Sequence, residues 1–103
     1  MEKIALVVTI EYKAESKSVF LQALFDHQHR SLKTERGTLQ FEILQPNDSS
    51  NTVVIFELYA NAEALKIHDS GTSLALFREQ AGSFISKASA QSCSVIQPQT
   101  SNA

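Results

Sequence analysis

The chain has 103 residues and a formal net charge of −2 at pH 7; 43% of its residues are hydrophobic and 19% are charged. This length and composition predict one packed domain, residues 1–97, followed by a polar tail, 98–103, and they exclude a disordered chain. A charge this close to zero, without a basic cluster, argues against nucleic acids and anionic membranes as partners.

The N-terminal apolar run, which ends at Ile10, is only about seven residues long and is interrupted by Thr9. Such a run is too short for a spanning helix and lacks the basic head and cleavage site of a signal peptide. Cys93 is the only cysteine, so an internal disulfide is excluded, and we expect a reducing, cytoplasmic location.

The first two predicted elements are a strand over 3–12 and a helix over 15–33. The strand alternates apolar residues on two faces, and the helix carries Leu21, Leu24, Phe25 and Leu32 on one stripe. His29 lies on the shoulder of that stripe, about 80° from Leu21, whereas His27 is expected to face solvent. Gly37 is the expected C-terminal cap.

The later elements alternate between extended and helical patterns. Residues 38–45 and 52–60 form an expected hairpin around the turn "PNDSSN". Asn61 is a good N-cap for a helix to about Asp69, because its side-chain oxygen can accept from an orphan backbone N–H. A second helix over 73–86 and a strand over 88–96 complete the chain.

The resulting order, β-α-β-β-α-α-β, predicts an α+β, ferredoxin-like subunit with an antiparallel sheet and helices on one face. The strand 52–60 is apolar on both sides, since Val53 and Ile55 alternate with Val54 and Phe56. An apolar sheet face rarely stays exposed to water in a soluble monomer. We therefore expect a homodimer through the sheet face, and a ligand cavity between sheet and helices.

Three titratable side chains on apolar elements are candidate catalytic groups: His29, Glu57 and His68. Glu57 shares its side of the strand with Val53, Ile55 and Tyr59, where a carboxylate is costly unless it is paired or protonated. Histidine has a pKa suited to acid–base chemistry near neutrality. Each group also has a structural interpretation: an ion pair or rim position for Glu57, a boundary histidine for His29 and a helix-dipole partner for His68. The H-x-H pair at 27 and 29 does not resemble a metal motif.

Three stretches together resemble the antibiotic biosynthesis monooxygenase domain family, over about residues 3–97. They are His29 followed by "ERGTLQFEILQ" (35–45), then "FELYANAEALKIH" (56–68), then the closing helix and strand. The resemblance implies a dimeric α/β barrel in which two ferredoxin-like subunits pack their sheets together, often with the C-terminal strand crossing to the partner.

The resemblance also implies site residues and activities. His29, Glu57, Tyr59, Asn61 and His68 match the family's pocket positions, and Phe25 and Leu65 are added as neighbouring substrate contacts. The family includes cofactor-independent oxygenases of quinols and aromatic polyketides, isomerases of a phosphorylated signalling compound, and haem-degrading members. This chain has no histidine in "SGTSLALF" where many relatives carry one, and no tryptophan, which disfavours haem chemistry.

We therefore expect a monooxygenase-like enzyme that needs neither cofactor nor metal and oxidises a small quinol or other enolisable compound with O₂. His29 or His68 would act as the base, Glu57 would orient an imidazole, and Asn61 would bind the oxyanion. Phe25, Tyr59 and Leu65 would contact the substrate. An isomerase that uses the same proton transfer, and a non-catalytic module that binds a small apolar molecule, remain as alternatives.

Overall fold

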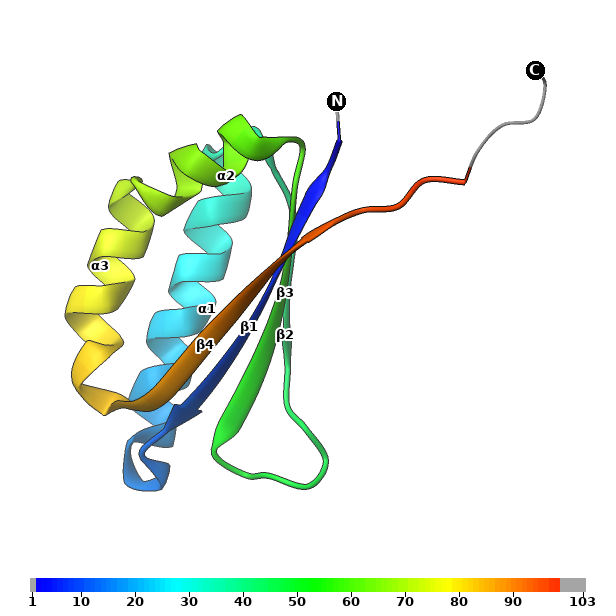
Figure 1. Cartoon of the computed structure of the whole chain (residues 1–103). Coiled ribbons are helices and arrows are strands. Elements are labelled where there is room, and N and C mark those ends of the chain that lie inside the picture. Colours follow the sequence, from blue (N-terminus) through cyan, green and yellow to red (C-terminus); the bar gives the residue numbers. More distant parts are fainter. Residues whose placement is uncertain (1, 99–103) are drawn as a thin grey trace, which may run out of the picture.

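The computed structural model describes residues 2–98 of the chain (Figure 1). Its elements, in order, are β1 (Ile4–Tyr12), the 3-10 helix η1 (Ala14–Ser16), α1 (Lys17–Thr34), β2 (Thr38–Leu44), β3 (Thr52–Tyr59), α2 (Ala62–Asp69), α3 (Thr72–Ala81), the 3-10 helix η2 (Gly82–Phe84) and β4 (Ile85–Ser94). This order confirms the expected β-α-β-β-α-α-β arrangement.

The four strands form one sheet in the order β2-β3-β1-β4, and every neighbouring pair is antiparallel. All three α-helices lie on the same side of this sheet (Figure 1). The predicted ferredoxin-like α+β subunit is therefore confirmed. In the described part of the chain, no helix combines the length and apolarity needed to cross a bilayer.

Two boundaries near the C-terminus differ from those predicted. The second late helix ends at Ala81 and not at residue 86, and β4 begins at Ile85 and not at residue 88. The cause is pairing with β1: Ile85 lies opposite Tyr12, and Lys13 N–H donates to the Phe84 carbonyl at 2.9 Å. Of the predicted tail, only residue 98 belongs to the described chain, and 99–103 lie outside it.

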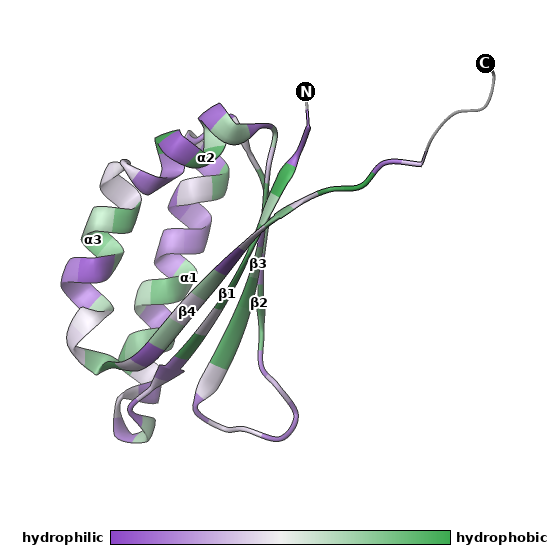
Figure 2. Cartoon of the chain, in the orientation of Figure 1, coloured by the Kyte–Doolittle hydropathy of each residue, from purple (hydrophilic) through white to green (hydrophobic). Residues whose placement is uncertain are grey.

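The helix-covered side of β3 carries Val53, Ile55, Glu57 and Tyr59, all of which are buried. The alternation of the strand predicted that these four residues share one side. Figure 2 shows the visible middle of β3 as hydrophobic, whereas the helices mix hydrophobic and hydrophilic residues. The hydrophobic core lies between the sheet and the helices, and both contribute buried residues to it: Ile10, Tyr12, Phe20, Ala23, Leu24, Phe41, Val53, Ile55, Phe77 and Ala81.

The other side of the sheet is also apolar at its centre. Phe56 lies opposite Val7 on β1, and Leu58 lies opposite Ala5. Val54, Phe56 and Leu58 are only half-buried, and Leu44 on β2 is 51% exposed. We call this surface, formed by Val7, Leu44, Val54, Phe56 and Leu58, the outer sheet face.

Gly37 does not cap α1 in the way that the sequence suggested. The C-cap of α1 is Glu35, and no described residue has a positive φ. Gly37 is required by packing, since a Cβ on it would lie 2.3 Å from the Ala64 Cβ on α2. The Gly37 carbonyl also accepts from the Ala60 N–H at 2.9 Å. The absence of a side chain at Gly37 therefore lets α2 sit close against the start of β2.

Candidate active site

A cavity of about 390 Å³ lies between the helices and the sheet. Most of its wall is apolar, contributed by the strands and by α1 and α3, as is usual for a small-molecule site. The polar exceptions are His27, Glu57 and His68 in the interior and the exposed residues Asp69, Arg78 and Ser89. The apolar lining residues are Leu6, Val8, Ile10, Leu24, Phe41, Ile55, Leu74, Phe77, Ile85, Ala88 and Ala90.

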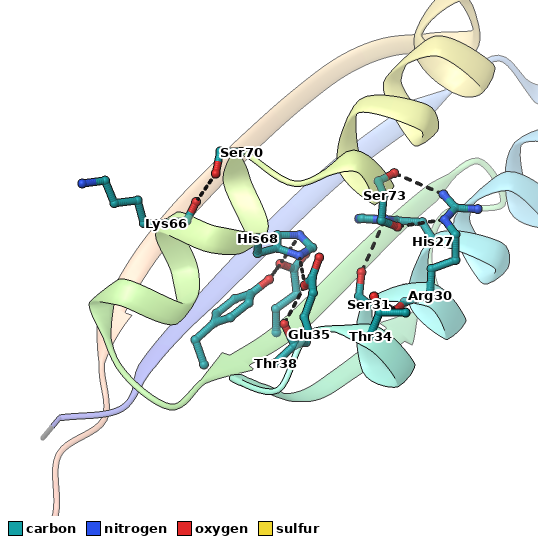
Figure 3. A network of polar contacts seen from close by, with 12 residues as sticks. His27, Arg30, Ser31, Thr34, Glu35, Thr38, Lys66, His68, Ser70 and Ser73 are labelled. Atoms are coloured by element: carbon teal, nitrogen blue, oxygen red, sulfur yellow. Dashed lines mark hydrogen bonds and ion pairs between the residues drawn. The ribbon is translucent and has the colours of Figure 1, made fainter.

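His68 lies in the last turn of α2, which begins where Asn61 Oδ1 accepts from the Ala64 N–H at 2.9 Å. Its ring is 2% exposed, and Nδ1 lies 2.7 Å from Glu35 Oε1 at the end of α1 (Figure 3). Thr38 Oγ1 donates to the same carboxylate oxygen at 2.8 Å. Because a carboxylate accepts, the pair favours a proton on Nδ1, which leaves Nε2 available as a base.

Glu57 lies across from the free side of this imidazole. Its Oε1 accepts a hydrogen bond from the Tyr59 hydroxyl and lies 3.7 Å from His68 Nε2. Burial raises the pKa of the Glu57 carboxyl, although the bond from Tyr59 opposes that shift. Burial and the neighbouring Glu57 likewise raise the pKa of the Tyr59 phenol, which stays a donor. Glu35, His68, Glu57 and Tyr59 thus form one continuous polar chain, which we call the carboxylate–imidazole chain.

His27 is the second buried histidine, at 3% exposure. Its ring stacks on Phe77 with centroids 5.2 Å apart and lies 5.2 Å from the His68 ring. Nδ1 lies 2.8 Å from Ser73 Oγ at the start of α3. Burial, then the charges of His68 and two arginines, lower the pKa of His27 to about 3, so this imidazole is neutral at physiological pH.

Both buried histidines line the cavity, and their hydrogen bonds leave the Nε2 atoms without a hydrogen-bond partner among residues 2–98. Throughout residues 2–98, every fully buried side-chain nitrogen or oxygen has a hydrogen-bond partner. The hydrogen bonds of both rings within that range are made by Nδ1 alone. Each Nε2 is therefore the ring nitrogen left free for a ligand in the cavity that both residues line.

The prediction that His29 faces the pocket and His27 faces solvent is wrong. His29 is exposed, and α1 buries Phe20, Ala23, Leu24, His27 and Ser31. The apolar stripe was placed through Leu21, Phe25 and Leu32, of which Phe25 and Leu32 are 45% and 44% exposed. His27 lies only about 20° from Phe20 around the helix, so that spacing was the signal that could have identified it.

Four expected substrate contacts lie away from the cavity wall. Phe25 is exposed on α1, Leu65 is half-buried on α2, and neither lines the cavity. The side-chain oxygen of Asn61 is engaged as the helix cap. Tyr59 is fully buried behind Glu57 and reaches the cavity only through that carboxylate.

Sequence reasoning missed Glu35, Ser73 and Arg30. Glu35 appeared only within the stretch "ERGTLQFEILQ", without a role of its own, and its partner His68 is 33 positions away. Ser73 and Arg30 are 43 positions apart. No local pattern connects residues at such separations. Among residues 2–98, no group of three or more His, Cys, Asp or Glu side chains is arranged as a metal site.

Residues 3–80 match the family described as antibiotic biosynthesis monooxygenase. The chain belongs to this family. The match covers most of the strands and helices that build the cavity, including His27, Glu35, Glu57 and His68. Membership supports a monooxygenase-like role, and no curated protein matches the sequence significantly.

Solved structures with the same fold come from several prokaryotes. A protein of Caulobacter crescentus is 18% identical with a TM-score of 0.90, over 93% of this chain and 92% of that one. A protein of Nitrosomonas europaea is 18% identical with a TM-score of 0.87, over 95% and 94%. Both are called a "putative antibiotic biosynthesis monooxygenase". A conserved protein of Methanosarcina mazei is 15% identical with a TM-score of 0.84, over 90% and 92%. At these identities the likeness establishes the fold.

Proposed function

We propose that this protein is a cofactor-independent monooxygenase that oxidises a small quinol or a similar enolisable compound with O₂. The observation that carries the proposal is the carboxylate–imidazole chain at the wall of an apolar cavity. A buried imidazole held by a carboxylate is a suitable general base near neutral pH. The apolar wall is suited to an aromatic ring, and family membership supports the oxygenase chemistry.

In the proposed reaction, His68 Nε2 removes the proton of a substrate hydroxyl. Glu35 stabilises the imidazolium through Nδ1–H, because the two atoms are already within hydrogen-bond distance. The electron-rich anion then reacts with O₂ at a ring carbon. One oxygen atom enters the ring as a hydroxyl and the other leaves as water, so that a quinol becomes a hydroxyquinone and supplies all the electrons.

Oxygen uptake with a panel of hydroquinones tests this function. Uptake should depend on both substrate and enzyme, stop under argon, and fall by roughly 10²- to 10⁴-fold in His68→Gln, which loses the base. His29→Gln is the matched control, since His29 is exposed, and it should retain full activity. Turnover that proceeds equally well under argon would remove the oxygenase proposal.

An isomerase is the second candidate, and the position of Glu57 favours it. Its carboxyl has a raised pKa and faces the cavity beside His68 Nε2. A base beside a carboxyl whose pKa is raised suits the transfer of a proton from one atom of a substrate to another. Turnover without oxygen consumption, measured by exchange of substrate protons with deuterated solvent, would select this candidate. The absence of any turnover, together with ligand binding unaffected by His68→Gln, would indicate a binding module.

We also propose that two copies pair through the outer sheet face and that the protein works in the cytoplasm. Val54, Phe56 and Leu58 leave apolar surface half-buried in a single chain, and covering such a surface is favourable at about 25 cal/mol per Å² before association costs. The single cysteine is compatible with a reducing compartment. Sedimentation at micromolar concentration should give about twice the chain mass.

A further inference from the structure

The contacts around His27 determine what this ring can do in the cavity. Two serine hydroxyls approach its Nδ1 atom: Ser73 Oγ at 2.8 Å and Ser31 Oγ at 3.5 Å. Figure 3 shows Ser31 and Arg30 on α1 directed toward Ser73 at the start of α3. Both serines are buried, so their hydroxyl hydrogens need acceptors within the protein.

Arg30 decides the direction of the shorter bond. Its Nε donates to Ser73 Oγ at 2.9 Å, and its Nη2 donates to the Ser73 carbonyl at 3.1 Å. An arginine can only donate, so Ser73 Oγ is an acceptor toward α1. Within the described residues, the acceptor placed for the Ser73 hydroxyl hydrogen is His27 Nδ1.

The opposite arrangement would leave polar groups unsatisfied. If Nδ1 carried the proton and donated to Ser73, neither Ser73 nor Ser31 would have an acceptor for its own hydroxyl hydrogen among residues 2–98. Leaving a buried donor unpaired costs about 1–3 kcal/mol. The neutral ring must then carry its single proton on Nε2, the nitrogen left free in a residue that lines the cavity.

We propose that Ser73 and Arg30 fix His27 as the Nε2–H tautomer, so that this ring donates a hydrogen bond to the oxygen anion of the bound substrate. The inference rests on the proposed function for the identity of that anion. His68 and His27 then have opposite roles: one Nε2 accepts the substrate proton, and the other supplies a fixed donor to the charge that remains. Ser73 and Arg30 are positioning residues that act through His27.

The inferred substrate class follows from this pair. The centroids of the His27 and His68 rings are 5.2 Å apart. A compound between them must present a hydroxyl that can lose its proton to His68. The oxygen anion that remains must then accept a hydrogen bond from His27. Phenols, quinols and enols satisfy this requirement. Amines and ethers do not, because they cannot become oxygen anions. A donor preorganised where charge develops is worth roughly 10²–10³ in kcat.

Nitrogen NMR of the full-length, ¹⁵N-labelled protein at pH 7 tests the tautomer without any substrate. Long-range proton–nitrogen correlations should give His27 a pyrrole-type Nε2 and a pyridine-type Nδ1, with the resonances assigned by their loss in His27→Gln. A pyrrole-type Nδ1, or a charged ring, would overturn the inference. Neither result depends on turnover, so the tautomer and the proposed oxidation can fail independently.

Variants of Ser73 test the positioning role. Ser73→Ala should introduce the Nδ1–H form, whereas Ser73→Thr, which keeps the hydroxyl, should preserve the wild-type pattern. Ser70→Ala is the matched control, because Ser70 is an exposed serine at the C-cap of α2 that donates to the Lys66 carbonyl. With an active substrate, Ser73→Ala should lower kcat by up to about 100-fold with little change in KM. An unchanged His27 tautomer in Ser73→Ala would contradict the role of Ser73. If that variant does not fold, Arg30→Gln replaces it, and an unchanged tautomer there would contradict the role of Arg30.

Discussion

Glu35 Oε1 and His68 Nδ1 lie 2.7 Å apart, although 33 positions separate the two residues in the chain. The contact joins the end of α1 to the last turn of α2, and both side chains are largely buried. Thr38 at the start of β2 holds the same carboxylate oxygen. Three elements therefore converge on one imidazole, which restricts both its orientation and the nitrogen that carries its proton.

Replacing Glu35 by Gln should lower kcat by roughly 10²-fold with a small change in KM. The amide preserves the shape of the side chain but removes the negative charge that stabilises the imidazolium of His68. Steady-state oxygen uptake measures the effect. Glu79→Gln makes the same change at an exposed position on α3, so it should have wild-type kinetics. Equal loss in the two variants would contradict a specific role for Glu35.

Glu57→Gln should stabilise the protein at neutral pH by on the order of 1 kcal/mol while reducing activity. Burial raises the pKa of Glu57, so the folded chain binds this proton more tightly than the unfolded chain does. Its contribution to stability is complete below the ordinary pKa of 4.5 and is lost as the pH rises through the folded value. Glutamine cannot ionise, so the free energy of unfolding measured in urea should be higher for the variant than for wild type at pH 7. At pH 4 this difference should disappear. A variant that is less stable than wild type at pH 7 would show that the ionised carboxylate is favourable.

His27 should make the protein sensitive to acid. Its pKa is lowered from 6.5 to about 3, so the unfolded chain binds the extra proton first, and stability falls as the pH drops through that window. The loss attributable to this residue should be on the order of a few kcal/mol. Urea unfolding of wild type and His27→Gln at several pH values isolates the effect. The difference between the two proteins in how steeply the free energy of unfolding changes with pH reports His27. His29→Gln should keep the wild-type slope.

Gly37→Ala should destabilise the fold by roughly 1–3 kcal/mol, because its Cβ would lie 2.3 Å from the Ala64 Cβ. Ala64→Gly removes that Cβ at a cost of about 1 kcal/mol to the helix. The double variant should be more stable than the sum of the two single changes predicts, which thermal unfolding can measure as a coupling energy. Strict additivity would mean that the two positions are not in contact.

Phe56→Glu should convert the proposed dimer into a monomer while leaving the helices and the cavity in place. The substitution puts a carboxylate at the centre of the outer sheet face, where pairing would bury it without a partner. Val19→Glu is the matched control, since Val19 is 58% exposed on α1, on the opposite side of the sheet. Sedimentation of the three proteins decides the matter. A monomeric wild type would refute the proposed pairing, as would a dimeric Phe56→Glu.

The fold was predictable because the spacing of apolar residues along the chain differs between strands and helices. The alternation in β3 placed Glu57 and Tyr59 on the same side as Val53 and Ile55, and the Asn61 cap located the start of α2. The rotation of α1 was misjudged because its inward stripe includes His27 and Ser31, which a hydrophobicity pattern counts as outward. Glu35 and Ser73 could not be assigned at all, because their roles arise from contacts between distant elements.

On β4 the cavity wall is made by Ile85, Ser89 and two residues with small side chains, Ala88 and Ala90. That strand supplies none of the acid–base groups. Larger or smaller residues at these two positions would reshape the space for a ligand while the proton-handling machinery stayed intact. Proteins with this fold could thus acquire new substrate preferences through changes in a single edge strand, while the side of the cavity that carries the acid–base groups is inherited unchanged.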